Sequence, residues 1–266
     1  MRMTRLAAQL NTVRAYCGTQ EELLDTLSRI RALGFDGVEL ESSLLKNADL
    51  QAVAQRLAQL GLEVCSIRSP FARTGYGMEE MIAEAKALNC IHVGVGTLTA
   101  SYFTMGPAGV EKYLAQAQAV CERFSKEGLR PLYSLRFHEF MRLSDGAWSF
   151  DKLEAATETA SYRWETDVLC LTRTAVEPPQ VFLRLAGRMP VCRLSDQKIR
   201  ENETYFFYAR REECPLGEGL FDLPAWIEAA KRAGAEWFTV GQDLCDRDPF
   251  ACLKASLEKA KEFGCA

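Results

Sequence analysis

The feature that most constrains the fold is a join that recurs along the chain, in which an amphipathic helical pattern ends at or near a glycine and an apolar run follows directly. The glycine suits a left-handed helix C-terminus, and the apolar run suits a strand covered on both faces, as parallel sheets require. Strands and helices are therefore expected to alternate. The join occurs in LGFDGVEL at 33–40, LGLEVCSI at 60–67, LNCIHVGV at 88–95, EGLRPLYSL at 127–135 and AGAEWFTV at 233–240.

The number of strand candidates indicates how the sheet is arranged. Eight candidates occur in 266 residues, and each is followed by a helical pattern. Eight such units predict an α/β fold closed into a (β/α)8 TIM barrel, and they disfavour an open sheet. No linker interrupts the units, so residues 1–266 are expected to form one TIM-barrel domain. The predicted strands are centred near residues 7, 38, 65, 93, 133, 167, 192 and 239.

Charge and composition exclude several classes of protein. The net charge is −4, from 32 basic and 36 acidic residues, so the basic surface expected of a nucleic-acid partner is missing. No stretch approaches the ~18 apolar residues that cross a bilayer, and the N-terminus lacks the apolar block of a secretion signal. We therefore expect no membrane partner and a cytoplasmic location, where the ten cysteines stay reduced. With only His92 and His138, a site of three imidazoles is excluded.

In a TIM barrel, chemistry is carried by residues at the C-terminal ends of the strands and in the loops that follow them. The two longest of these connections, about 198–222 and 96–106, are candidate lids. The aromatic run YFFY at 205–208 favours a packed hairpin or subunit contact over stacking on a substrate. Polar residues at or after the predicted strand ends are Gln9, Asn11, Glu39, Glu41, Arg68, Ser134, Arg136, Asp167, Arg193, Asp196, Gln242 and Asp243.

Motifs near both ends of the chain resemble one group of TIM barrels. AQLNTVRAYCG at 8–18 and GFDGVELES at 34–42 are similar to a Q-L-Y-T-V-R opening and a G-Y-D-G-V-E-L second strand. PLGEGLFDLPAWIEAAKRAG at 215–234 and GQDLCDRDP at 241–249 are similar to a G-E-G loop and an E-Q-D…D-R-D-P close. The chain thus resembles, over nearly its full length, the sugar-phosphate isomerase and epimerase group of the xylose-isomerase-like barrels. The resemblance implies the same fold, a small sugar or sugar-derived ligand, and a homodimer or homotetramer.

The resemblance also implies a divalent metal such as Mn²⁺ or Mg²⁺, held by carboxylates and one histidine while a neighbouring base moves a proton. This chain departs from the pattern at those positions. Arg193 stands for the histidine of H-L-K-D, Gly241 stands for the glutamate of E-Q-D, and only Glu139 remains of the polar residues in Y-H-N-H-D-F-E-F. We predict that no metal ligands operate here and that Arg193 replaces the cation, paired with Asp167 or Glu139.

Two functions stay open. One is a metal-free isomerase or epimerase in which Glu139 or Glu39 carries the proton and Arg193 stabilises an enediolate. The other is a catalytically inactive barrel that binds or senses an anionic carbohydrate; Glu39 is then equally consistent with an inner-layer polar residue. An abasic-site endonuclease is excluded, because it needs a multi-histidine zinc cluster and a basic groove. The candidate catalytic residues are Glu139, Glu39 and Arg193, and the candidate substrate-binding residues are Asp167, Arg136, Arg68, Asp196 and Gln242.

Overall fold

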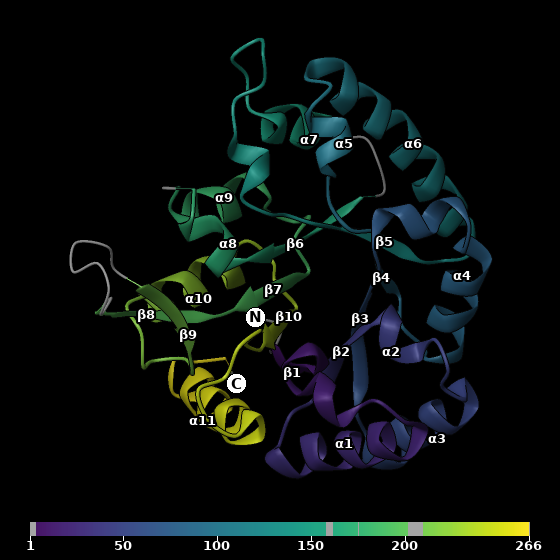
Figure 1. Cartoon of the computed structure of the whole chain (residues 1–266), viewed down its shortest axis with the longest axis vertical. Coiled ribbons are helices and arrows are strands. Elements are labelled where there is room, and N and C mark those ends of the chain that lie inside the picture. Colours follow the sequence, from purple (N-terminus) through teal and green to yellow (C-terminus); the bar gives the residue numbers. More distant parts are fainter. Residues whose placement is uncertain (1–3, 158–161, 175, 202–209, 266) are drawn as a thin grey trace.

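Eight parallel strands close into a barrel in the computed structural model, which describes residues 4–157, 162–174, 176–201 and 210–265 (Figure 1). Their order around the barrel is β1-β10-β7-β6-β5-β4-β3-β2, and β1 pairs with both β10 and β2. The predicted α/β TIM barrel is confirmed, and each predicted centre lies inside an observed strand. The strands are β1 Arg5–Gln9, β2 Gly37–Glu41, β3 Glu63–Arg68, β4 His92–Gly94, β5 Arg130–Ser134, β6 Arg163–Asp167, β7 Val191–Leu194 and β10 Trp237–Val240.

Helices surround the barrel (Figure 1). Helix α1 shows how the sequence sets their ends: Thr19 and Glu22 form a capping box at its start, and Gly34 ends it in the left-handed conformation. None of the described helices is long and apolar enough to span a membrane. The longer helices are α1 Gln20–Leu33, α3 Leu50–Leu60, α4 Met78–Ala87, α6 Pro107–Lys126, α7 Ser149–Thr157, α9 Pro178–Arg184, α10 Leu223–Arg232 and α11 Pro249–Glu262.

Short helical segments follow the C-terminal ends of several strands and so surround the barrel mouth. Each comes directly after a strand or within the connection that leaves it, which is where TIM barrels place their binding residues. They are η1 Leu10–Tyr16, α2 Ser42–Leu45, η2 Phe71–Gly75, α5 Ala100–Phe103, η3 His138–Phe140 and α8 Val168–Thr172.

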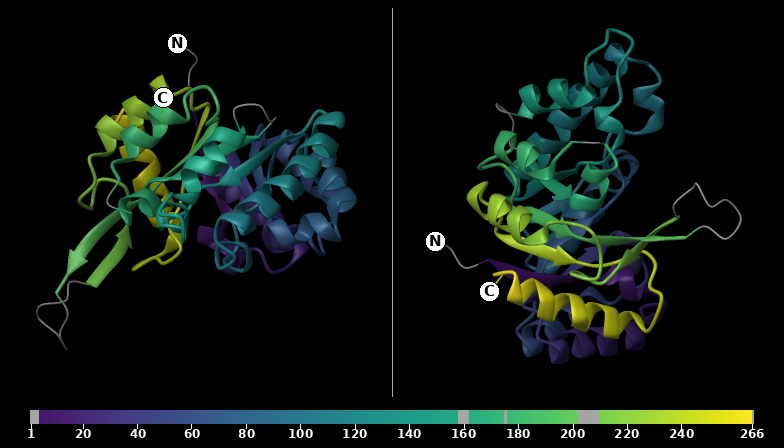
Figure 2. Two further views of the ribbon diagram at one scale, coloured as in Figure 1. Left: turned by 90° about the horizontal axis from the view of Figure 1, so that it is seen from above. Right: turned by 90° about the vertical axis from the view of Figure 1, so that its left-hand side faces the viewer.

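The two long connections adopt regular structure in part. After β7 the chain forms an antiparallel hairpin of β8 Asp196–Arg200 and β9 Arg210–Cys214. Both views in Figure 2 show this hairpin extending outward from the barrel. The other connection, 96–106, contains α5. The YFFY run at 205–208 lies outside the described residues, so its predicted packing stays a prediction.

Apolar side chains close the floor of the barrel. Five buried residues form a cluster separate from the core between sheet and helices: Ala7, Cys65, Leu132, Val191 and Trp237. Trp237 is the largest of the five, and Gly37 of β2 makes room for it. A Cβ built at Gly37 would lie 2.9 Å from the Trp237 ring and 2.5 Å from the Glu63 carbonyl oxygen.

We expect Gly37→Ala to lower the free energy of unfolding by about 1–3 kcal/mol, because the added methyl group overpacks the barrel floor. Gly75→Ala is the matched control, since no atom lies within 4 Å of a Cβ at that position. Chemical denaturation of the two variants and the parent measures the difference. Equal unfolding midpoints for the two variants would contradict this account of the floor.

Candidate functional site

Above the apolar floor, the inward-facing positions of the strands are polar. Successive side chains of a strand point to opposite faces, so in β1, β5, β7 and β10 the residue two positions beyond the floor residue also faces the interior. These residues are buried. Within two residues along these strands, the side chains that face the barrel interior therefore change from apolar to polar. Gln9 follows Ala7, Ser134 follows Leu132, Arg193 follows Val191, and Thr239 follows Trp237.

Arg68, at the end of β3, lies among three carboxylates in this layer. Its Nη1 is 3.6 Å from Glu39 Oε1 and 3.4 Å from Glu41 Oε1, and its Nε is 3.6 Å from Glu165 Oε1. Burial opposes the charge on Arg68, but Glu165, Glu39 and Glu41 outweigh it and raise the pKa of the guanidinium. Arg68 is thus a fixed cation shared by residues of β2 and β6.

Glu39 is fully buried beside this cation. It accepts hydrogen bonds from Gln9 Nε2 at 2.9 Å and from Ser66 Oγ at 3.1 Å. Burial and the nearby Glu165 carboxylate raise the pKa of Glu39 to about 8, against the opposing effect of Arg68. Near neutral pH, Glu39 is therefore mainly protonated and can donate a proton.

Glu165 was not selected from the sequence, although it lies next to Glu39 in this layer. It is buried in β6 and accepts a hydrogen bond from Ser134 Oγ at 3.0 Å. The signal that could have found it is its spacing: Glu165 precedes Asp167 by two residues, so both face the interior. Two carboxyl groups beside one guanidinium are an arrangement that can supply an acid and a base.

Arg193 forms a second buried group of charges. Its Nη1 is 3.4 Å from Asp167 Oδ2, and its Nη2 is 3.3 Å from Asp243 Oδ1. Arg136 approaches the same Asp167 oxygen at 3.7 Å. Arg193 is 3% exposed, and its Nε has no hydrogen-bond partner in the described chain. Of the two partners predicted for Arg193, the structure brings Asp167 to it and not Glu139.

Glu139 lies in a different network, outside the barrel interior. It accepts hydrogen bonds from the Tyr133 hydroxyl, from Thr97 Oγ1 at 2.6 Å and from the Arg136 backbone N–H at 3.0 Å, and His138 Nε2 lies 3.1 Å away. Tyr133 belongs to the core between sheet and helices, which fixes the side on which this network lies. Glu139 is thus not grouped with Glu39; its contacts hold the backbone that carries Arg136.

Two other predicted site residues organise loops around the mouth. Asp196 accepts hydrogen bonds from four backbone amides, those of residue 197 and of residues 217, 219 and 221. Its oxygens are therefore used within the chain. Gln242 donates its backbone N–H to Thr12 Oγ1 and its side-chain N–H to the Leu244 carbonyl. Neither side chain contacts the groups around Arg68 and Arg193.

The residues present do not fit the divalent metal that the family resemblance implies. Arg193 stands where that family has a histidine, and a guanidinium repels a cation. A Cβ at Gly241 would lie 2.7 Å from Gln9 Cβ and 2.6 Å from Thr12 Oγ1, so an acidic side chain cannot be added there without a shift. Across the described residues, no three His, Cys, Asp or Glu side chains are placed to hold a metal ion. The fixed positive charge comes from Arg68, Arg136 and Arg193 instead.

Comparison with known proteins supports the fold. No family model and no curated protein sequence matches the chain. Solved structures do match it over nearly its full length. The chain shares the TIM-barrel fold of these structures, which include a xylose isomerase-like TIM barrel fusion protein.

Three solved structures illustrate the likeness. A sugar phosphate isomerase/epimerase from Parabacteroides distasonis has 13% identity and a TM-score of 0.75, with 96% of each chain covered. L-ribulose 3-epimerase has 16% identity and a TM-score of 0.74, covering 98% of this chain and 94% of that one. IOLI protein, solved with a binding zinc atom, has 12% identity and a TM-score of 0.74, with 98% of each chain covered.

We expect Glu39 to make the free energy of unfolding fall as the pH rises from about 4.5 to about 8. The pKa of Glu39 is raised from 4.5 to about 8 in the folded chain, so the folded state binds the proton more tightly than the unfolded state over this range. Glu39→Gln removes this ionisation and should make the fall smaller, whereas the exposed Glu63→Gln should not. Chemical denaturation across this range tests the expectation; equal pH slopes in the parent and Glu39→Gln would contradict it.

Proposed function

We propose that this protein is a metal-independent isomerase or epimerase that acts on a small anionic sugar derivative. The observation that carries the proposal is the placement of two buried carboxyl groups, Glu39 and Glu165, on one guanidinium, Arg68. The names of the similar structures agree with this class of reaction, since they include a sugar phosphate isomerase/epimerase and L-ribulose 3-epimerase.

The chemistry needs a base, an acid and a fixed positive charge. Glu165 takes the proton from the carbon next to the substrate carbonyl, and the electron pair of the broken C–H bond forms a carbon–carbon double bond. The carbonyl π electrons move to oxygen and give an enediolate, whose negative charge the Arg68 guanidinium stabilises. For epimerisation, Glu39 in its protonated form returns a proton to the same carbon, and the oxyanion re-forms the carbonyl. For isomerisation, Glu39 protonates the former carbonyl carbon while the hydroxyl proton on the first carbon moves to the enediolate oxygen, so that the new carbonyl forms on the first carbon. Return of the proton from Glu165 to Glu39 restores both groups. No oxidant or reductant is required.

The remaining charged residues bind and orient the substrate. Arg193 is held by Asp167 and Asp243, so its direction is fixed before a ligand arrives. Such preorganised charge stabilises an oxyanion without a reorganisation cost during the reaction. Arg136 and Glu41 have side chains 27% and 28% exposed, which places them at the accessible rim of the mouth. We assign Arg136 and Glu41 to the hydroxyl groups of the substrate.

A carbohydrate-binding barrel without activity is the second candidate, and one observation favours it. Glu39 has no exposed surface, and Arg193 is already paired with two carboxylates. A ligand could bind to Arg136 and Glu41 at the rim and never reach the acid and base. Binding and proton transfer must therefore be measured separately.

Exchange of substrate hydrogen with deuterium in heavy water, followed by NMR, tests for proton transfer. We expect exchange into a small set of ketoses, aldoses and their phosphates and acids with a chelator present. Glu165→Gln should slow the exchange by about 10²-fold or more, because it removes the base. Glu63→Gln, an exposed glutamate paired with Arg5, is the control and should leave the rate unchanged. Ligand binding without any exchange would instead support the inactive barrel.

Elemental analysis of the purified protein tests metal independence. We expect well under one divalent ion per chain, since the ligand positions carry Arg193 and Gly241. Protein purified from medium supplemented with Mn²⁺ and Zn²⁺ should give the same result. The contrary result would be about one ion per chain that remains bound through dialysis. If a chelator then removed both the ion and the activity, the metal site would be intact.

A further inference from the structure

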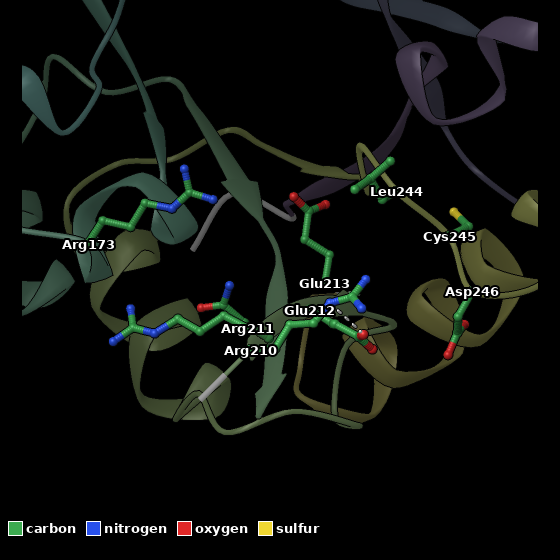
Figure 3. Close-up of a pocket in the computed structure, with 9 residues that line it drawn as sticks. Arg173, Arg210, Arg211, Glu212, Glu213, Leu244, Cys245 and Asp246 are labelled. Atoms are coloured by element: carbon green, nitrogen blue, oxygen red, sulfur yellow. Dashed lines mark ion pairs between the residues drawn. The ribbon is translucent and has the colours of Figure 1, made fainter. Parts of the chain in front are cut away.

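A cavity of about 360 Å³ lies beside the barrel mouth, bounded by the β8–β9 hairpin, the end of α8 and residues 244–246 (Figure 3). Its volume is within the range of small-molecule sites. Glu213 lines it and accepts a hydrogen bond from the Asp243 backbone N–H at 2.7 Å. Because Asp243 also pairs with Arg193, the cavity and the candidate site share a wall.

Two guanidiniums that line this cavity lack an acidic partner. Across the described residues, neither Arg173 nor Arg211 forms an ion pair, whereas Arg210 pairs with Glu212 at 3.2 Å. Figure 3 shows Arg173 and Arg211 on one side of the hairpin strand and Arg210 turned toward the other side. Two free positive charges therefore face the same space.

The other acidic residues of the lining do not neutralise these two charges. Glu212 forms ion pairs with Arg200 and Arg210 of the hairpin. Asp246 pairs with Lys198 at 2.8 Å. Glu213 is the acidic group left over, and it sits at the wall toward Asp243. The cavity thus has more positive than negative charge available to a ligand.

Gln197 adds a neutral hydrogen-bonding group to the lining of this cavity. The residue is 6% exposed, and its side-chain amide lies on the cavity surface and forms no side-chain hydrogen bond within the described residues. An oxygen acceptor in the cavity would accept a hydrogen bond from the amide N–H.

We propose that this cavity binds an oxyanion of the substrate, a phosphate or a carboxylate, through Arg173, Arg211 and Gln197. Guanidinium groups recognise the paired oxygens of such anions in a forked geometry, and the amide adds a neutral donor. The inference rests on the proposed function only for the identity of the molecule that carries the anion. The sugar carbons would then extend over Asp243 toward Arg68.

Binding of inorganic phosphate to the full chain, measured by calorimetry at constant ionic strength, tests the site without requiring turnover. We expect Arg173→Ala and Arg211→Ala each to weaken binding about tenfold or more, and Gln197→Leu to weaken it severalfold. Arg200→Ala is the matched control: it removes a guanidinium from the same hairpin, but Arg200 pairs with Glu212 and does not line the cavity. Its effect should stay within about twofold.

Three results would overturn the proposal: no phosphate binding by the parent protein, equal weakening by Arg200→Ala, or full binding in the Arg173→Ala, Arg211→Ala double variant. Thermal unfolding checks that every variant folds, and Arg211→Lys should restore part of the affinity. Repeating the titrations with acetate, and with a sugar phosphate against the sugar acid of the same skeleton, distinguishes the two anions.

The same variants separate this proposal from the proposed function. With an anionic sugar that is turned over, Arg211→Ala should raise KM and leave kcat nearly unchanged, while a neutral sugar should show neither change. Phosphate binding that depends on Arg173 and Arg211, in a protein with no deuterium exchange, would overturn the isomerase and retain the cavity. Deuterium exchange in a protein whose phosphate binding is unaffected by substitution of either arginine would retain the isomerase and overturn the cavity proposal.

Discussion

The rest of the site depends on the charge balance around Arg68. A guanidinium inside a barrel is tolerated only when carboxylates compensate it, because removing one partner leaves a buried charge unpaired. Glu39 and Glu165 provide that compensation from opposite sides of the barrel, and the Glu165 charge raises the pKa of Glu39. One arrangement therefore holds the cation and shifts the ionisation of Glu39.

The barrel makes this arrangement possible by joining strands that are distant in sequence. Asp167 and Arg193 are register partners on adjacent strands, so their side chains meet without help from a loop. The floor below them is closed by Trp237, which keeps the polar layer near the mouth. Asp196, at the start of β8, then fixes the rim by accepting hydrogen bonds from backbone amides. The strands of the barrel and the ordered loops at its mouth together fix the directions of the charged side chains.

The sequence predicted the strands well, because each helix end and apolar run is a local signal. It also predicted that Arg193 and Asp167 belong together, since both lie near the ends of neighbouring strands. Glu165 was missed because the prediction considered residues at the strand ends, whereas Glu165 lies two residues before the end of β6. Glu139 was grouped with the site because it matches the glutamate of the Y-H-N-H-D-F-E-F pattern, but the chain turns outward there into η3. The sequence offered a packed hairpin or subunit contact at 205–208, but it did not predict the strands β8 and β9, because DQKIR and RREEC have no apolar face.

The close packing of Gly241 links this glycine to the buried carboxyl group of Glu39. A Cβ at position 241 would lie 2.8 Å from Gln9 Oε1, and Nε2 of the same amide donates a hydrogen bond to Glu39. A larger side chain at 241 would therefore displace that amide and alter the hydrogen bonding of Glu39 without touching it. The small size of Gly241 thus protects a group that lies two strands away around the barrel.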